Sequence, residues 1–200
     1  MYCRDYSNRE VTFLRRTFVC ILLCLLLCLS ACGGEDNAVS TAIEFRAALV
    51  QANGCSFQAE IEADLGKETQ RFTVSCDFAA DGTAKLTLLA PETISGITAT
   101  VTENGGKITY DGIAVDFGLL ANGEVVPAAA PAIVAQCWAS EYISAAGYEE
   151  ELCRVTYEKG FDEKTLLMDT WFENEVPICA EVCYNQNRIL RLTISDFHFH

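Results

Sequence analysis

A run of ten residues, from Cys55 to Asp64, alternates strictly between apolar and polar side chains. Cysteine, phenylalanine, alanine and isoleucine occupy the odd positions, and serine, glutamine, glutamate and aspartate the even ones. A period of two is typical of a β-strand with one buried and one solvated face. The same alternation returns from Arg71 to Phe78, after a turn near Leu65 to Lys67. The two runs therefore predict an antiparallel hairpin with one apolar face.

Seven further runs continue the strand pattern, and short polar connectors of the kind that join antiparallel neighbours separate most of them. They span Ala84 to Ala90, Ile97 to Thr102, Ile108 to Tyr110, Leu152 to Glu158, Thr165 to Phe172, Ile178 to Tyr184 and Ile189 to Phe199.

Two segments have helical spacing instead. Thr41-Ala42-Ile43-Glu44 has the form of a capping box, which predicts a helix from about Ala42 to Ala52 that ends at Asn53-Gly54. Pro131 suits the first turn of a second helix, which we expect to run to about Ala145. The apolar stripe of this second helix consists of Ile133, Val134, Cys137, Trp138 and Tyr142.

About nine strands spaced by about 4.8 Å make a sheet roughly 40 Å wide, which two short helices cannot cover unless the sheet curls around them. The predicted fold is mainly β (α+β), with a curved antiparallel sheet forming an incomplete barrel around two helices. The side chains expected on its inner surface are Phe45, Leu49, Phe57, Ile61, Phe72, Val74, Trp138 and Tyr142. They either line a ligand cavity or fill the core as a plug, and the sequence leaves both interpretations open.

The N-terminal region carries a different signal. An apolar run from Thr17 to Leu29 follows Arg15-Arg16 and is about 13 residues long, whereas a helix needs about 20 to cross a bilayer. The run ends in Leu29-Ser30-Ala31-Cys32, which resembles the lipobox of bacterial lipoproteins. An uncleaved signal anchor is the alternative.

The lipobox resemblance implies a signal peptide over residues 1–31 and a lipid on Cys32. Residues 32–40 would be the lipidated cysteine and its tether, and residues 41–200 the domain. Such a protein would be held by its lipid anchor on the extracytoplasmic face of the cell membrane.

The order of elements also resembles a known family. A lipobox, an N-terminal helix, a long antiparallel meander containing Pro91-Glu92, and a tail with Glu175-Val176-Pro177 and Ile194-Ser195-Asp196-Phe197 are similar to the LolA/LolB-like half-barrel carriers. The resemblance covers roughly residues 40 to 199. It implies a hydrophobic pocket for acyl chains inside the curved sheet, with the helices as a lid.

After removal of the leader, six cysteines remain besides Cys32. In a chain that we expect to be exported, such a composition favours disulfides. Cys55 and Cys76 share the apolar face of the first hairpin. A turn centred between Leu65 and Gly66 would place them opposite each other, so a disulfide between them is one prediction. Two free thiols packed in the core are the alternative.

Charge and residue types exclude several functions. The chain has 14 basic and 28 acidic residues, and removing the leader takes away four bases and two acids, which leaves a net charge of −16. This excess of acid argues against nucleic-acid binding, which depends on lysine and arginine. The two histidines, His198 and His200, are both terminal, and no cysteine pair has zinc-site spacing. We therefore expect no catalytic residues, no metal and no cofactor.

The leading hypothesis is a non-enzymatic, membrane-anchored lipoprotein that binds or transfers a lipid or other hydrophobic ligand in a half-barrel cavity. The alternative is an interaction lipoprotein with a fully packed barrel, whose acidic outer face meets a protein partner in the cell envelope.

Overall fold

The computed structural model describes residues 34–64, 69–102, 105–110, 113–117, 120–121, 124–160, 165–184 and 187–200. The strands in its first part are β1 (Gly54–Asp64), β2 (Thr69–Ala79), β3 (Ala84–Ala90), β4 (Thr98–Thr102), β5 (Gly105–Tyr110), β6 (Ile113–Phe117), β7 (Leu120–Ala121) and β8 (Glu124–Val125). The strands in its second part are β9 (Tyr142–Glu149), β10 (Leu152–Lys159), β11 (Leu166–Glu173), β12 (Val176–Tyr184) and β13 (Asn187–Phe199). The helices are α2 (Gly34–Gln51) and α3 (Ala130–Ser140), with short 3₁₀ turns η1 (Glu92–Ile94) and η2 (Pro127–Ala129).

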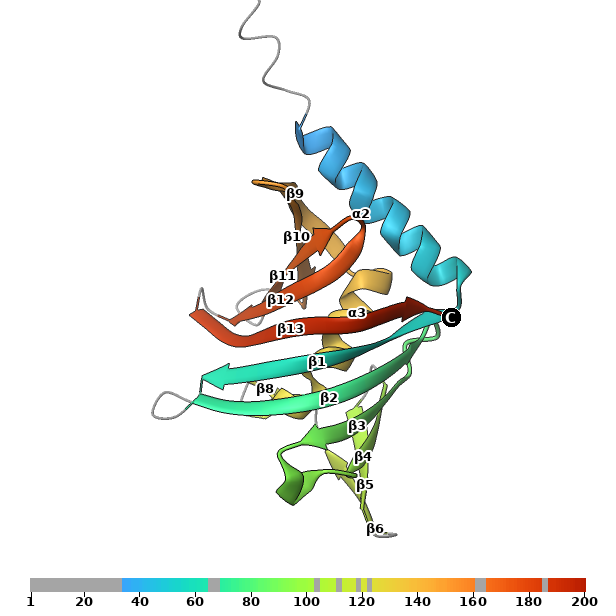
Figure 1. Ribbon diagram of the computed structural model, residues 1–200, viewed down its shortest axis with the longest axis vertical. Coiled ribbons are helices and arrows are strands. Elements are labelled where there is room, and N and C mark those ends of the chain that lie inside the picture. Colours follow the sequence, from blue (N-terminus) through green and yellow to red (C-terminus); the bar gives the residue numbers. More distant parts are fainter. Residues whose placement is uncertain are drawn as a thin grey trace, which may run out of the picture.

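Among the described residues, eleven strands form one antiparallel sheet in the order β6-β5-β4-β3-β2-β1-β13-β12-β11-β10-β9, and β7 pairs with β8 separately. The long central strands β1 and β13 join the start of the domain to its end. The sheet is strongly curved and does not close, since β6 and β9 are its two edges (Figure 1). The predicted fold class, an incomplete barrel, is confirmed.

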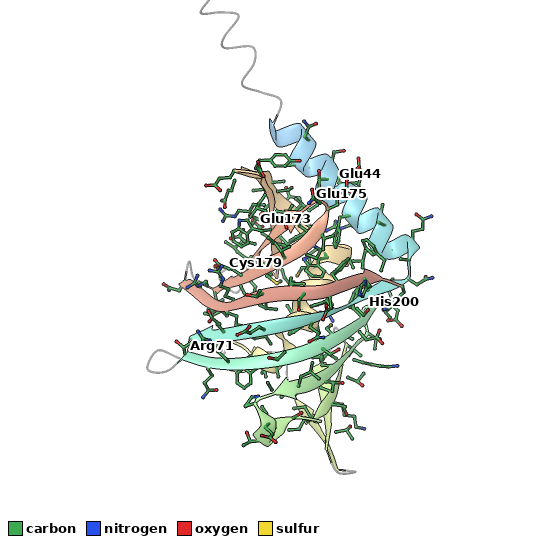
Figure 2. The ribbon with its side chains drawn as sticks, in the orientation of Figure 1. Glu44, Arg71, Glu173, Glu175, Cys179 and His200 are labelled. Atoms are coloured by element: carbon green, nitrogen blue, oxygen red, sulfur yellow. The ribbon has the colours of Figure 1, made fainter. Side chains whose placement is uncertain are left out.

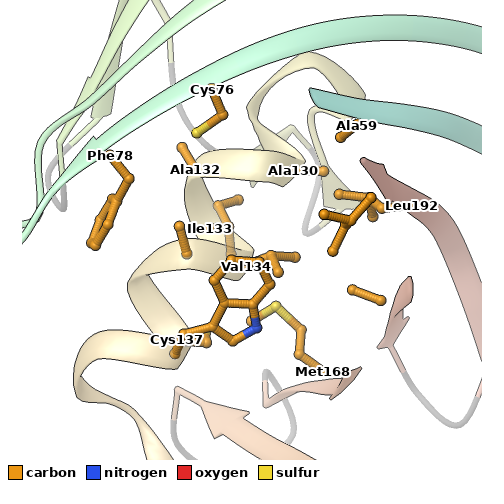
Figure 3. Packing of buried hydrophobic residues seen from close by; sticks show 14 of the residues in the cluster. Ala59, Cys76, Phe78, Ala130, Ala132, Ile133, Val134, Cys137, Met168 and Leu192 are labelled. Carbon is orange, nitrogen blue, oxygen red and sulfur yellow. The ribbon is translucent and has the colours of Figure 1, made fainter. Parts of the chain in front are cut away.

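Helix α3 occupies the concave side of the sheet, where it packs against β2, β3 and β10. It is buried on every side from Ala130 to Trp138, because it is surrounded by the curved sheet. Small residues such as Ala132 allow it to approach the strands closely, and Figure 3 shows Ile133 and Val134 among side chains of the sheet. The sheet supplies Cys76, Phe78, Met168 and Leu192 to this core.

Helix α2 lies across one end of the half-barrel, from above β9 to the C-terminal end of β13 (Figure 1). It packs mainly against β9 and β10, and it also touches α3 and β1. We call the end that carries the C-terminus the proximal end. The distal end is the opposite one, where β1 and β12 end and β2 and β13 begin.

The structure corrects the predicted ends of both helices. Helix α2 begins at Gly34 rather than Ala42, so residues 34–40, which we expected to be a tether, are helical. Ala38, within this extension, is fully buried. Helix α3 ends at Ser140, because residues 142–149 form strand β9 along β10. The strand β6 was also not predicted.

Candidate functional site

The structure places the residues predicted for the inner surface as follows. Six of them are buried in the hydrophobic core: Phe45, Leu49, Phe57, Ile61, Val74 and Trp138. Phe72 is half-buried and packs against this core. Tyr142 does not belong to the set, since it is the first residue of β9 and its side chain is 70% exposed. The prediction for Tyr142 is wrong because the helix that was expected to carry it ends two residues earlier.

The space beneath α2 is filled by an aromatic cluster, which consists of Phe45, Phe57, Trp138, Phe172, Phe197 and Phe199. The ring centroid of Phe45 lies 4.8 Å from that of Phe172 and 5.8 Å from that of Trp138. The buried indole Nε1 of Trp138 donates a hydrogen bond to Thr170 Oγ1 at 3.0 Å. Rings in such edge-on contact stabilise the core beyond the area they bury. The proximal end of the half-barrel is therefore packed by its own side chains.

A bulge in β13 brings two of these rings to the concave side. The pairing of β1 with β13 shifts register between Ser56 and Gln58, and Asp196 has a positive φ of 51°. Gln58 Nε2 donates to Asp196 Oδ2 at 2.8 Å across the bulge. The extra residue lets both Ile194 and Phe197 face the core although they are three positions apart. An odd spacing between two core residues breaks the strict alternation of a strand and indicates a bulge. The sequence analysis missed this signal.

Arg46 joins the two helices. Its guanidinium donates to three carbonyl oxygens at the C-terminal end of α3, those of Trp138 at 2.8 Å, Glu141 at 2.5 Å and Cys137 at 3.3 Å. The last carbonyls of a helix have no partner within it and carry partial negative charge, so a cation there is favourable. Arg46 thereby fixes α2 over the end of α3, a role that no pattern in the sequence indicated.

Apolar side chains at the distal end remain partly accessible. We call this set the distal rim, and it consists of Phe72, Ile94, Ile97, Tyr184 and Ile189. All five are half-buried and pack against the core cluster. They come from both halves of the sheet, since β2 and the turn after β3 supply three of them and β12 and β13 the others. Helix α2 crosses the other end of the half-barrel, away from this rim (Figure 1).

The outer, convex side carries a pocket of about 370 Å³ over β9 and β10, lined by Ala145, Ala146, Gly147, Tyr148, Glu149, Arg154 and Thr156. Its charged groups neutralise one another. Arg154 binds Glu149 Oε1 at 2.5 Å and Asp169 Oδ2 at 2.8 Å. Trp171 Nε1 donates to Glu149 Oε2 at 2.8 Å, and this bond, together with Arg154, lowers the pKa of Glu149. The pocket therefore presents no unpaired cation of its own to a ligand.

The convex face elsewhere is polar and charged, and the acidic residues outnumber the basic ones in the whole chain. Arg71 and Cys179 lie on this face, and Glu173 and Glu175 lie at the turn between β11 and β12 (Figure 2). Arg71 pairs with Glu62 at 2.7 Å. This is the alternation predicted from the first hairpin, with apolar residues inside and polar ones outside.

The first hairpin has a different register from the one predicted. Cys55 pairs with Phe78, and Cys76 pairs with Phe57, so the two cysteines are diagonal neighbours and not opposite each other. Both are free, buried thiols. Burial raises the pKa of Cys55 to about 12, and it also raises the pKa of Cys76. The predicted register is wrong by two residues, because the alternation of apolar and polar residues is unchanged by a shift of two.

The two histidines lie at the end of β13. His200 Nε2 is 3.4 Å from Asp77 Oδ1, and His198 is exposed. No group of three or more histidine, cysteine or acidic side chains within the described ranges is placed to hold a metal ion.

Of the helices that the structure describes, none combines the length and the hydropathy needed to cross a membrane. Cys32 lies outside the described residues.

Comparison of the sequence with known proteins found no matching family and no matching curated protein. Comparison of the structure found a LolA superfamily protein from Nitrosomonas europaea, at 10% identity and a TM-score of 0.44, covering 84% of this chain and 94% of that one. Lipoprotein LppX from Mycobacterium tuberculosis is similar at 10% identity and a TM-score of 0.39, covering 80% and 92%. LprF from Mycobacterium bovis is similar at 13% identity and a TM-score of 0.40, covering 82% and 95%. At these identities, the likeness concerns the overall fold alone.

Proposed function

We propose that this chain is a membrane-anchored lipoprotein whose half-barrel binds a lipid or another hydrophobic ligand. Residues 1–31 serve as its signal peptide, Cys32 carries the lipid, and the domain stays on the extracytoplasmic face of the cell membrane. The lipobox supports this anchoring, and the half-barrel supports the binding role.

The observation that carries the binding proposal is the distal rim. Its five apolar side chains stay partly in contact with water at the edge of a concave surface that is otherwise apolar and buried. Covering such side chains with an acyl chain is favourable by about 25 cal/mol for each Å² of apolar area removed from water. The ligand therefore enters at the distal end, since the aromatic cluster fills the proximal end.

The proposed ligand lies between two groups of residues. Phe72, Ile94 and Ile97 contact it from one half of the sheet, and Tyr184 and Ile189 contact it from the other. The Tyr184 hydroxyl offers a hydrogen bond to a polar headgroup, since tyrosine combines an apolar ring with a polar tip. A long apolar chain with a small polar group fits this arrangement.

Native mass spectrometry of the full chain, extracted from cells in detergent, tests the proposal. We expect a non-covalent mass of a few hundred daltons, in addition to the covalent lipid, that organic solvent removes. Phe72→Asp and Ile94→Asp place a charge in the rim and should each reduce the fraction of loaded protein at least fivefold. Val176→Asp is the matched control, because Val176 is an exposed apolar residue outside the rim, with 41% exposure. Equal loading in all four proteins would contradict binding at the rim.

One observation favours the alternative, an interaction lipoprotein with a packed barrel. Helix α3 and the aromatic cluster fill the described centre of the half-barrel with protein side chains. This alternative predicts that the wild-type chain carries its covalent lipid and no other mass in the same experiment.

A further inference from the structure

The outer side of α2 carries an apolar strip that none of the other described elements covers. Val39, Ile43 and Val50 are 38%, 54% and 50% exposed. Their spacing of four and seven residues places them on one side of the helix. They do not belong to the side that faces the sheet, which consists of Ala38, Ala42, Phe45 and Leu49, all buried.

The strip lies close to the C-terminal end of α3. Arg46 follows Ile43 by three positions and precedes Val50 by four, so it lies along the strip on the same side of α2. Its guanidinium reaches the carbonyl oxygen of Glu141 at 2.5 Å. Tyr142, the next residue, is 70% exposed, but it pairs with Glu158 and its side chain therefore lies on the convex face of the sheet, whereas α2 packs over the concave face, where Cys153 contacts Ala38.

The flank of the helix next to the strip is polar. Ser40, Glu44 and Gln51 are all exposed, and each directly follows one residue of the strip in the chain. Each is therefore turned by about 100° around the helix axis from the apolar residue before it. Polar side chains therefore border the apolar strip directly on this flank of α2.

The position of the proposed anchor decides what covers the strip. Cys32 is two residues before the first residue of α2, so its Cα lies within about 7 Å of that of Gly34. A lipid on Cys32 would hold the start of the helix close to the bilayer surface. We propose that the strip of Val39, Ile43 and Val50 rests in the interfacial region of the membrane and lays the domain on its side. This inference rests on the proposed lipidation of Cys32.

The charge of the chain defines the kind of membrane contact. With a net charge of −16 after removal of the leader, the protein gains nothing from anionic headgroups, so the contact is apolar and suits a zwitterionic surface. The contact is also shallow, because the strip consists of single side chains on a helix that remains attached to the sheet through Phe45 and Leu49.

The positions of the three strip residues along α2 distinguish a helix parallel to the membrane surface from one perpendicular to it. Along the axis, Val39, Ile43 and Val50 lie about 8, 14 and 24 Å from Gly34, at 1.5 Å per residue. A helix that lies on the bilayer brings all three to the same depth. A helix that stands on its N-terminus brings only Val39 close to the lipid.

Quenching by brominated lipid tests the inference on the full chain, produced with its lipid and reconstituted in phosphatidylcholine vesicles. Tryptophan is introduced one position at a time as Val39→Trp, Ile43→Trp and Val50→Trp. The matched controls are Ser40→Trp, Glu44→Trp and Gln51→Trp, and the signal of the two native tryptophans is measured in the wild-type protein and subtracted. We expect the three strip positions to be quenched to a similar extent, and at least threefold more than the three controls.

Each other outcome overturns the inference in a recognisable way. If the protein floats with the vesicles but all six positions are equally unquenched, the anchor holds and the strip faces water. If quenching falls from position 39 to position 50, the helix stands upright. A stable dimer in detergent, with the strip protected and unquenched, would mean that a second copy covers it. If the protein does not float, the proposed anchoring at Cys32 fails, and the membrane contact fails with it.

Discussion

Single residues hold the two helices together, and Arg46 is the clearest case. Its half-buried guanidinium meets three carbonyl groups of one helix end, while Arg71 forms an exposed pair with Glu62, in which the side chains are 68% and 40% exposed. Hydrogen bonds that involve a charged donor contribute about 1.5–3 kcal/mol, whereas exposed ion pairs contribute about 0–1 kcal/mol. The two arginines therefore differ in their contribution to stability because of the number and burial of their acceptors, rather than because of their charge alone.

We expect Arg46→Met to lower the free energy of unfolding by about 2 kcal/mol, because it removes the charged donor from the carbonyls of Trp138 and Glu141 at the end of α3. The corresponding change Arg71→Met should cost less than about 1 kcal/mol. Urea unfolding followed by circular dichroism measures both. A similar small loss in the two variants would show that Arg46 does not cap α3.

At the scale of elements, the bulge in β13 decides which side chains reach the core. Without the extra residue near Asp196, strict alternation from Ile194 would turn Phe197 and Phe199 toward solvent. With it, the two rings pack 5.0 Å apart in the aromatic cluster beneath α2. The bulge therefore connects the end of the sheet to the packing of α2, and it needs a residue that tolerates positive φ.

Asp196→Val should cost at least about 1–2 kcal/mol, because a branched side chain is unfavourable at the φ of 51° and because the bond from Gln58 is lost. Ser195→Val, one residue earlier and also exposed, serves as the control and should be nearly neutral. Near-ultraviolet circular dichroism should weaken in the first variant only, because its signal depends on the fixed packing of the aromatic rings. An unchanged spectrum with unchanged stability would contradict the role given to the bulge.

At the scale of the whole molecule, the curved sheet keeps several titratable groups away from water. Burial raises the pKa values of Cys55, Cys76, Cys137 and Tyr157, and for Cys55 the pKa rises from its ordinary value of 9.0 to about 12. Below pH 9 these thiols are protonated in both the folded and the unfolded chain. Above pH 9 the unfolded chain loses protons that the folded chain keeps. The stability that is fully present below pH 9 is therefore lost as the pH rises toward the folded pKa values.

For each such thiol, the free energy of unfolding should fall by about 1.4 kcal/mol per pH unit above pH 9. Urea unfolding under reducing conditions at pH 8, 9, 10 and 11 measures the slope. Cys55→Ala should remove the contribution of one thiol between pH 9 and 11. The same slope in wild type and Cys55→Ala would mean that Cys55 does not titrate as a buried free thiol.

Much of the fold could be predicted from the sequence, because it depends on local periodicity. Alternation from Cys55 to Ala63 determines which side of β1 faces the core, and every odd residue there is buried. The spacing around Ile133 and Trp138 likewise predicts the helix inside the sheet, and Asn53 has the positive φ expected of a helix stop. Of the candidate site, the buried inner residues were predicted, whereas Arg46 and most of the distal rim were not.

Only the tertiary structure decided the rest, because those features depend on partners that are distant in the chain. Residues 142–149 suit a helix or a strand, and they become β9 because β10 offers backbone hydrogen bonds along its edge. The register of the first hairpin was missed by two residues, since alternation is unchanged by a shift of two and the choice falls to the turn. Short-range pattern thus determines which face of each element is buried, and long-range pairing decides which elements form and in which register they meet.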